Sequence, residues 1–219
     1  MKDIEGRHSS GGGTTLASAQ QEIQENMAVQ AELAKKGVHE IVRAGTIMLE
    51  CLQAGGKVIA FGNGGSAADA QHFTAELVGR YRADRRAIAA IALTTDSSAL
   101  TSISNDLGFE NIFSRQLEAI GKPGDVALAI STSGNSPNVL RAVVLAKKLG
   151  IATIGLSGRS GGELRDSVDL CLSVPSDSTP RIQEAHSLII HILCGIVEKA
   201  VLDAGPTSDA ITASIAPSG

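Results

Sequence analysis

Short, unbroken apolar runs alternate with amphipathic stretches along most of this chain. Each run ends in a polar or glycine-rich turn, and the turn leads into a stretch whose apolar residues recur at helical spacing. Such runs are typical of strands that are buried on both faces of a parallel sheet. The strands predicted in this way are 57–61, 87–93, 125–130, 151–156 and 168–174.

The regular alternation of strands and helices predicts an α/β fold, a three-layer αβα sandwich around a five-stranded parallel sheet. Two additional helices, 16–36 and 39–54, precede the first strand. They carry more apolar surface than one sheet requires, so we expect one of them to pack on another subunit. A last helix is predicted from 179 or 180 to 201. Shorter helices are expected from 66 onward and over 99–104, 111–120, 138–149 and 162–166.

Length and composition indicate one folded unit. The 219 residues are 43% hydrophobic, enough for one sizeable core, and we expect a single domain over 16–203. Residues 1–15 are polar and glycine-rich and contain IEGR at 4–7, a protease-recognition sequence, so this stretch is expected to be disordered and the remnant of an engineered expression sequence. A disordered tail is expected over 204–219.

The charge balance excludes some classes of partner. A net charge of −4 and an aromatic content of 2% without tryptophan argue against nucleic acid as a direct ligand. The sequence shows neither a bilayer-length apolar run nor a signal-peptide pattern, which predicts a cytoplasmic protein that does not enter the membrane. Three widely spaced cysteines indicate buried, reduced thiols rather than a disulfide framework.

The first candidate site follows the strand at 57–61. Glycines 62, 64 and 65 leave backbone amides free, and Ser66 with Asp69 resembles a capping box at the start of a helix, where anions bind. His72 and Glu76 are four residues apart and so share one helix face. Taken singly, the glycines are more typical of an ordinary tight turn and the His/Glu pair of a solvated ion pair.

A second polar loop, STSGNSP at 131–137, also follows a predicted strand. Ser136 as N-cap and Pro137 as first helical residue mark a helix start. Hydroxyls and free amides without a lysine suit a phosphate monoester, although a polar turn with a well-capped helix would look the same.

The last helix carries a polar stripe. Gln183, Ser187 and His191 follow one another at intervals of four residues, whereas His186 lies about 140° away around the helix at 100° per residue. A histidine between two isoleucines is often a satisfied core residue, so spacing alone does not assign His191 a role.

Four segments together resemble the sedoheptulose 7-phosphate isomerases (phosphoheptose isomerases) of the sugar isomerase, or SIS, fold. They are GNGGSAADAQHFTAEL, IALTTDSSALTSISND, STSGNSPNVL and RIQEAHSLIIHILCGIVE. The resemblance implies a homotetramer with active sites at subunit interfaces. It also implies conversion of sedoheptulose 7-phosphate to D-glycero-D-manno-heptose 7-phosphate, the first step toward the nucleotide-activated heptose of lipopolysaccharide cores.

The resemblance also implies roles for individual residues. The catalytic base would be Glu76 and its acid/base partner His191. The phosphate would be held by Ser66, Ser131, Thr132, Ser133 and Ser136. The sugar would be contacted by Asn63, Gly64, Thr95, Asp96, Asp106 and Gln183. Zn²⁺ would be bound by His72, Glu76, Gln183 and His191.

Aldose/ketose isomerisation passes through an enediol, so it needs a carboxylate that takes and returns one proton and a group that protonates the oxygens. Zinc could polarise the carbonyl. Gln183 and His191, however, are about 12 Å apart along an ideal helix, so binding one ion would need long reaches from both. If Glu76 is a zinc ligand, its freedom to act as the base is open.

Two other functions are compatible with the same sequence. One is a non-catalytic SIS adaptor of the replication-initiation type that binds a sugar phosphate or a protein; the presence of both Glu76 and His191 favours the enzyme. The other is an isomerase of a different ketose phosphate. Asp84, Arg85 and Arg86 stand where relatives usually have arginine followed by proline, which leaves the substrate preference less secure than the reaction type.

Overall fold

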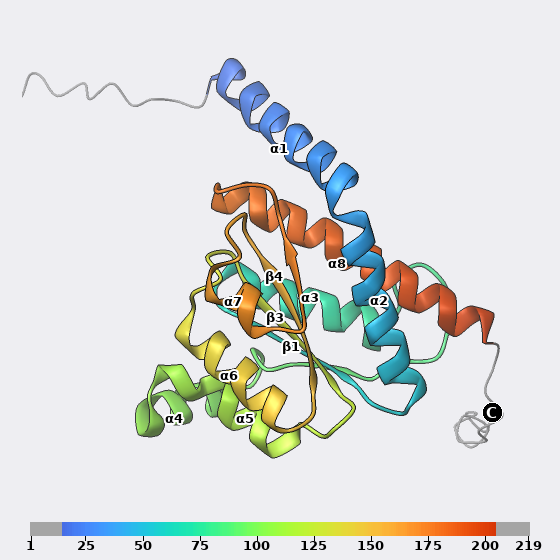
Figure 1. The fold of residues 1–219 in the computed structure, drawn as a ribbon, viewed down its shortest axis with the longest axis vertical. Helices are drawn as coiled ribbons and strands as arrows, with labels where there is room; N and C mark the ends of the chain where they lie inside the picture. Colours follow the sequence, from blue (N-terminus) through green and yellow to red (C-terminus); the bar gives the residue numbers. More distant parts are fainter. Residues whose placement is uncertain (1–14, 205–219) are drawn as a thin grey trace, which may run out of the picture.

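The computed structural model describes residues 15–204 and shows a five-stranded, fully parallel sheet between two helical layers (Figure 1). The strand order is β2-β1-β3-β4-β5. The strands are β1 (Val58–Gly62), β2 (Ala90–Ala92), β3 (Val126–Ser131), β4 (Ala152–Ser157) and β5 (Leu170–Ser173). The predicted αβα architecture is therefore confirmed.

Helices α2, α3 and α8 cover one face of the sheet, and α5 and α6 cover the other. In chain order the helices are α1 (Leu16–Lys36), α2 (Val38–Gln53), α3 (Gly65–Val78), α4 (Ser97–Leu107), the 3-10 helix η1 (Phe109–Asn111), α5 (Ile112–Ile120), α6 (Pro137–Lys148), α7 (Gly162–Ser167) and α8 (Thr179–Asp203). The central strands are mostly apolar because both of their faces are buried.

Successive residues of β1 show how the core is divided. Val58 and Ala60 pack with α2, α3 and α8, while Ile59 and Phe61 pack with α5 and α6. All four are fully buried. Since side chains alternate along a strand, one apolar run of five residues supplies both cores.

Helix α8 is long and apolar enough to cross a membrane when judged by length and hydropathy alone. In this fold it is instead a core helix, with Ala185, Ile189 and Leu193 fully buried against the sheet. His186 lies on the same buried side, where its Nε2 is 3.3 Å from the carbonyl oxygen of Ser157. Burial lowers the pKa of His186 to about 4, so the imidazole is neutral and Nε2–H donates to that carbonyl.

Three local predictions are corrected. The second strand is only Ala90–Ala92, because the preceding residues form an irregular segment. The helix predicted over 99–104 is Ser97–Leu107, so Asn105 and Asp106 lie within it rather than in a loop. Its start is set by Asp96, whose carboxylate accepts a hydrogen bond from the Ala99 amide at 2.9 Å.

The expectations for residues 1–14 and 205–219 lie outside the described residues. Thr15, which was assigned to the disordered N-terminal stretch, is described as the N-cap of α1, where its hydroxyl accepts a hydrogen bond from the Ser18 amide at 3.2 Å. The domain limits of 16–203 stay a prediction.

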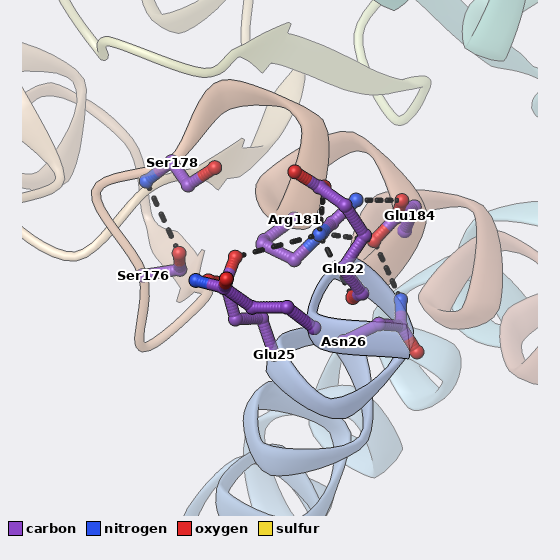
Figure 2. A network of polar contacts seen from close by, with 8 residues as sticks. Glu22, Glu25, Asn26, Ser176, Ser178, Arg181 and Glu184 are labelled. Carbon is purple, nitrogen blue, oxygen red and sulfur yellow. Dashed lines mark hydrogen bonds and ion pairs between the residues drawn. The ribbon is translucent and has the colours of Figure 1, made fainter. Parts of the chain in front are cut away.

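Helix α1 projects from the body of the molecule and is tied to it near the start of α8 (Figure 1). Figure 2 shows the tie: the guanidinium of Arg181 donates to the Glu184 carboxylate through Nε and Nη2, at 2.7 and 2.6 Å, and to the Glu22 carbonyl through Nη1 at 2.9 Å. Asn26 donates to the same Glu184 carboxylate at 2.6 Å. Arg181 is only 7% exposed, so a largely buried cation links α1 to α8.

Candidate active site

The chain turns sharply between β1 and α3, and two glycines make the turn possible. Gly64 has φ 56° and ψ −120°, a conformation that residues with a side chain rarely adopt. A Cβ on Gly65 would lie 2.3 Å from Nε2 of Gln183, so this glycine lets α8 approach the start of α3. The prediction that glycine shapes this turn is confirmed.

The capping box predicted at Ser66 and Asp69 is wrong. Helix α3 begins earlier, with Gly64 as the N-cap, and Ser66 lies inside the first turn with its amide bonded to the Asn63 carbonyl at 3.0 Å. Ser66 is buried. Asp69 instead faces α8 and accepts a hydrogen bond from the Ser187 hydroxyl at 3.1 Å, and burial raises the pKa of its carboxyl group.

The side chains of α3 and α8 converge at His72, Glu76 and His191. Nε2 of His72 lies 3.2 Å from Oε1 of Glu76 and 3.3 Å from Nε2 of His191. One ligand atom from each of the three residues falls within 4.8 Å of the others. Sequence spacing placed the first two on one helix face, and the fold adds His191 from the same chain.

Tyr81, in the irregular segment after α3, packs on this cluster and was not predicted to belong to it. Its ring is nearly parallel to that of His191, with ring centroids 5.7 Å apart and an interplanar angle of 22°. His72 meets His191 edge-on at 4.9 Å. The imidazole of His191 is thus contacted by two rings.

The predicted stripe on α8 is confirmed as a face that packs along α3. Its three residues meet successive turns: Gln183 lies against Gly65, Ser187 bonds Asp69 and His191 meets His72. Gln183 is therefore two turns from the histidine pair, and its place in a metal site stays a prediction.

The second polar loop connects β3 to α6 and folds around its hydroxyls. Ser131 Oγ lies 3.0 Å from Ser136 Oγ and 3.5 Å from Ser133 Oγ. Ser136 is the N-cap of α6 and Pro137 its first residue, as predicted. The Ser136 hydroxyl makes no capping bond with the helix amides. Pro137 has no N–H and the Val139 amide donates to Oδ1 of Asn138 at 2.9 Å, so the hydroxyls are the main groups that this loop offers to an anion.

Asn63 and Asn138 join the two candidate loops. Each side-chain amide donates to the other's carbonyl oxygen, both at 2.9 Å. β1 and β3 are neighbours, with Gly62 paired to Ile130, so their carboxyl ends lie side by side. Asn138 is buried and was missed from the sequence, because only the pairing of these strands brings it to the first turn.

The residues assigned to the sugar after β2 are not brought to the cluster by contacts among the described residues. Asp96 caps α4, and Thr95 donates to the Ala92 carbonyl at 3.2 Å. Asp106 accepts from the Asn105 side chain at 2.7 Å on exposed α4. Their predicted contacts with sugar hydroxyls stay predictions.

Comparisons with known proteins point in one direction. Residues 23–158 match the family model of the SIS domain. The phosphoheptose isomerase of Campylobacter jejuni serotype O:6 is 55% identical over 175 residues, covering 80% of this chain and 92% of that protein. That of Geotalea daltonii is 52% identical over 178 residues, covering 81% and 93%.

Solved structures give the same result. Phosphoheptose isomerase GmhA from Neisseria gonorrhoeae has a TM-score of 0.80 at 46% identity, covering 84% of this chain and 100% of that one. A phosphoheptose isomerase from Francisella tularensis has a TM-score of 0.82 at 40% identity, covering 84% and 98%.

Proposed function

This chain belongs to the phosphoheptose isomerases of the SIS domain family, and we propose that it converts sedoheptulose 7-phosphate to D-glycero-D-manno-heptose 7-phosphate in the cytoplasm. Its product would enter the synthesis of nucleotide-activated heptose for lipopolysaccharide cores. The observation that carries the proposal is the convergence of His72, Glu76 and His191 between α3 and α8. A binding adaptor would not need this carboxylate beside two imidazoles.

Glu76 is the proposed base and His191 the proposed acid/base partner. The reaction moves a proton from C1 to C2 of the sugar through an enediol, while the O1 hydroxyl loses its proton and the C2 carbonyl oxygen gains one. Glu76 is partly exposed, at 24%, so its carboxylate can reach a substrate while staying fixed at 3.2 Å from His72. His191 can donate to or accept from a sugar oxygen through its imidazole.

The same three residues fit a zinc ion. Two imidazole nitrogens and a carboxylate oxygen are a common set in catalytic zinc sites, which keep a further position open. When bound, zinc would supply Lewis-acid polarisation of the sugar carbonyl. Gln183 is the proposed fourth ligand. The chelator experiment below tests whether turnover needs the ion.

We assign the phosphate to the loop at the start of α6, with Ser131, Thr132, Ser133 and Ser136 as its binding residues and Ser66 as a further contact. The support is a set of clustered hydroxyls at the N-terminus of a helix. Asn63 and Gly64 would line the sugar, since the Asn63–Asn138 pair holds the first turn beside this loop. Thr95, Asp96, Asp106 and Gln183 complete the proposed sugar contacts.

The proposed assembly is a homotetramer with active sites at subunit interfaces. Helix α1 supports it: Leu16, Ile23 and Met27 are exposed by 77%, 62% and 64% on a helix that stands away from the body (Figure 1). Apolar surface of this kind is typical of a partner interface.

One experiment tests the function. The protein is incubated with sedoheptulose 7-phosphate in heavy water, with and without a zinc chelator, and the product is analysed for an aldose that carries deuterium. Deuterated aldose is expected, and its absence in the metal-loaded protein would favour the adaptor. Loss of turnover with chelator, restored by zinc, would establish that metal is required. Full activity after metal removal would leave Glu76 as the base without an ion.

A further inference from the structure

The irregular segment between α3 and β2 is held by one buried carboxylate. Glu198 of α8 accepts hydrogen bonds from three consecutive amides: Oε1 from Tyr81 at 3.1 Å, both oxygens from Arg82 at 3.0 and 3.2 Å, and Oε2 from Ala83 at 3.2 Å. Glu198 is only 4% exposed. A carboxylate that accepts from three amides fixes the backbone on which Tyr81 is carried.

Arg85 joins the same carboxylate to the end of α3. Its side chain is 1% exposed, and its Nε lies 3.2 Å from Oε1 of Glu198, as an ion pair whose N–H is not aimed at the oxygen. Its Nη2 donates to the Glu76 carbonyl at 2.7 Å and its Nη1 to the Leu77 carbonyl at 2.9 Å. Arg85 thus caps the helix turn that carries the proposed base.

Burial alone would raise the pKa of Glu198, but the amides of Arg82, Tyr81 and Ala83, together with Arg85, hold it below its ordinary value. The carboxylate is therefore ionised wherever the enzyme is folded at neutral pH. An ionised, fully bonded group in the core is a rigid support rather than a mobile one.

Tyr81 connects this support to His191. Its ring stacks on the imidazole at 5.7 Å, and the guanidinium of Arg82 lies 4.8 Å from the ring centroid. One turn after His191, Gly195 also lies beside the ring, since a Cβ there would be in ordinary contact with Cε1 of Tyr81 at 3.7 Å. The Tyr81 ring thus lies along α8, beside both His191 and Gly195.

We infer that Glu198, Arg85 and Tyr81 are positioning residues for the isomerisation: the Glu198–Arg85 pair fixes the segment, and the Tyr81 ring fixes the orientation of the His191 imidazole beside Glu76. The inference rests on the proposed catalytic roles of Glu76 and His191. The hydroxyl of Tyr81 takes no part in it; the flat ring does.

The test compares Tyr81→Leu, Tyr81→Phe and Glu198→Gln with wild type and with His191→Ala. Tyr81→Leu removes the flat ring and is expected to lower kcat about 10-fold or more, because small misplacements of reacting groups are costly, with KM for sedoheptulose 7-phosphate unchanged. Its zinc affinity, measured by chelator competition, should fall about 10-fold, as when a group that orients a ligand is lost. Tyr81→Phe keeps the ring and should restore both values.

Glu198→Gln keeps the size of the side chain but loses its charge, and it should lower kcat without raising KM. This variant tests the inference independently if Tyr81→Leu folds poorly. Thermal melting of each variant reports whether it is folded. Wild-type kcat and zinc affinity in folded Tyr81→Leu or Glu198→Gln would overturn the inference, as would a Tyr81→Phe variant as impaired as Tyr81→Leu. Full activity of His191→Ala would instead overturn the proposed role of His191.

Discussion

His72 and His191 face each other across the contact between α3 and α8, with their Nε2 atoms 3.3 Å apart. Two imidazole nitrogens at this distance either form an N–H···N hydrogen bond or both direct a lone pair at a common cation. The Glu76 carboxylate lies 3.2 Å from the same His72 nitrogen, which supplies negative charge for a cation.

We therefore predict that zinc binds in a one-to-one ratio and that His72→Ala and His191→Ala each weaken it strongly. Isothermal titration with zinc on metal-stripped protein measures the ratio and the affinity. His39→Ala, which removes an exposed histidine of α2, is the matched control and should bind as wild type does. Unchanged zinc binding in both site variants would contradict the proposed ligand set.

Replacing the proposed base should stop turnover and spare the fold. Glu76→Gln keeps the shape of the side chain but cannot take a proton, so kcat should fall about 10²- to 10⁴-fold. Turnover and the binding of sedoheptulose 7-phosphate are measured on the same preparation. A variant that binds the sugar phosphate and isomerises it at the wild-type rate would disprove the assignment.

The loop at the start of α6 should act on the phosphate alone. Ser133→Ala and Ser136→Ala each remove a hydrogen bond to a charged group, worth about 2 kcal/mol, so KM should rise about 10-fold or more with little change in kcat. Ser167→Ala, at the end of α7, is the control. Binding of the unphosphorylated sugar should be the same in all variants; a change there would place the serines at the sugar instead.

The buried His186 predicts a pH dependence of stability. Its pKa is about 4 in the folded protein and 6.5 for an ordinary histidine, so between these values the unfolded chain binds more protons. Stability should therefore be complete above about pH 6.5 and fall on acidification toward pH 4, by about 3 kcal/mol from this group. His186→Gln can still donate to the Ser157 carbonyl and does not titrate. Urea unfolding at pH 7 and pH 4.5 should show a smaller loss in the variant; parallel losses would refute the prediction.

The tie between α1 and α8 should govern assembly. Arg181→Leu leaves Glu184 and Glu22 without their cation, so α1 should lose its fixed direction (Figure 2). The proposed tetramer of this variant should then dissociate already at protein concentrations at which the wild type stays assembled. Sedimentation velocity over a dilution series measures this. Lys199→Leu, which breaks an exposed pair with Asp203 on the same helix, should sediment like wild type. Identical sedimentation profiles for the two variants would show that α1 is not part of the subunit interface.

Apolar pattern was sufficient for the architecture because strands buried on two faces leave unbroken apolar runs. It also placed the two candidate loops, since the carboxyl ends of parallel strands share one edge. The prediction was wrong where a side chain had two possible partners. Asp69 could cap its own helix or bond a neighbouring one. Because α8 approaches α3 closely at Gly65, Asp69 accepts its hydrogen bond from Ser187 of α8.

Residues whose contacts come from segments far apart in the sequence could not be predicted from sequence pattern. Asn138 reaches Asn63 because β1 and β3 are adjacent. Tyr81 contacts His191 from an irregular segment whose amides bond Glu198 of α8. Arg85 was noted as a departure from the family pattern beside the substrate loops. The fold shows it to be a buried cap of α3.

The proposed acid/base pair and its neighbouring histidine come from a single polypeptide, because α3 and α8 of one chain supply them all. In a mixed assembly, a subunit with Glu76→Gln and a subunit with His191→Ala would each contain one damaged pair and no intact one. Two such alleles in one cell should therefore fail to complement each other, whereas a defect confined to residues lent across the interface could be masked by a healthy neighbour.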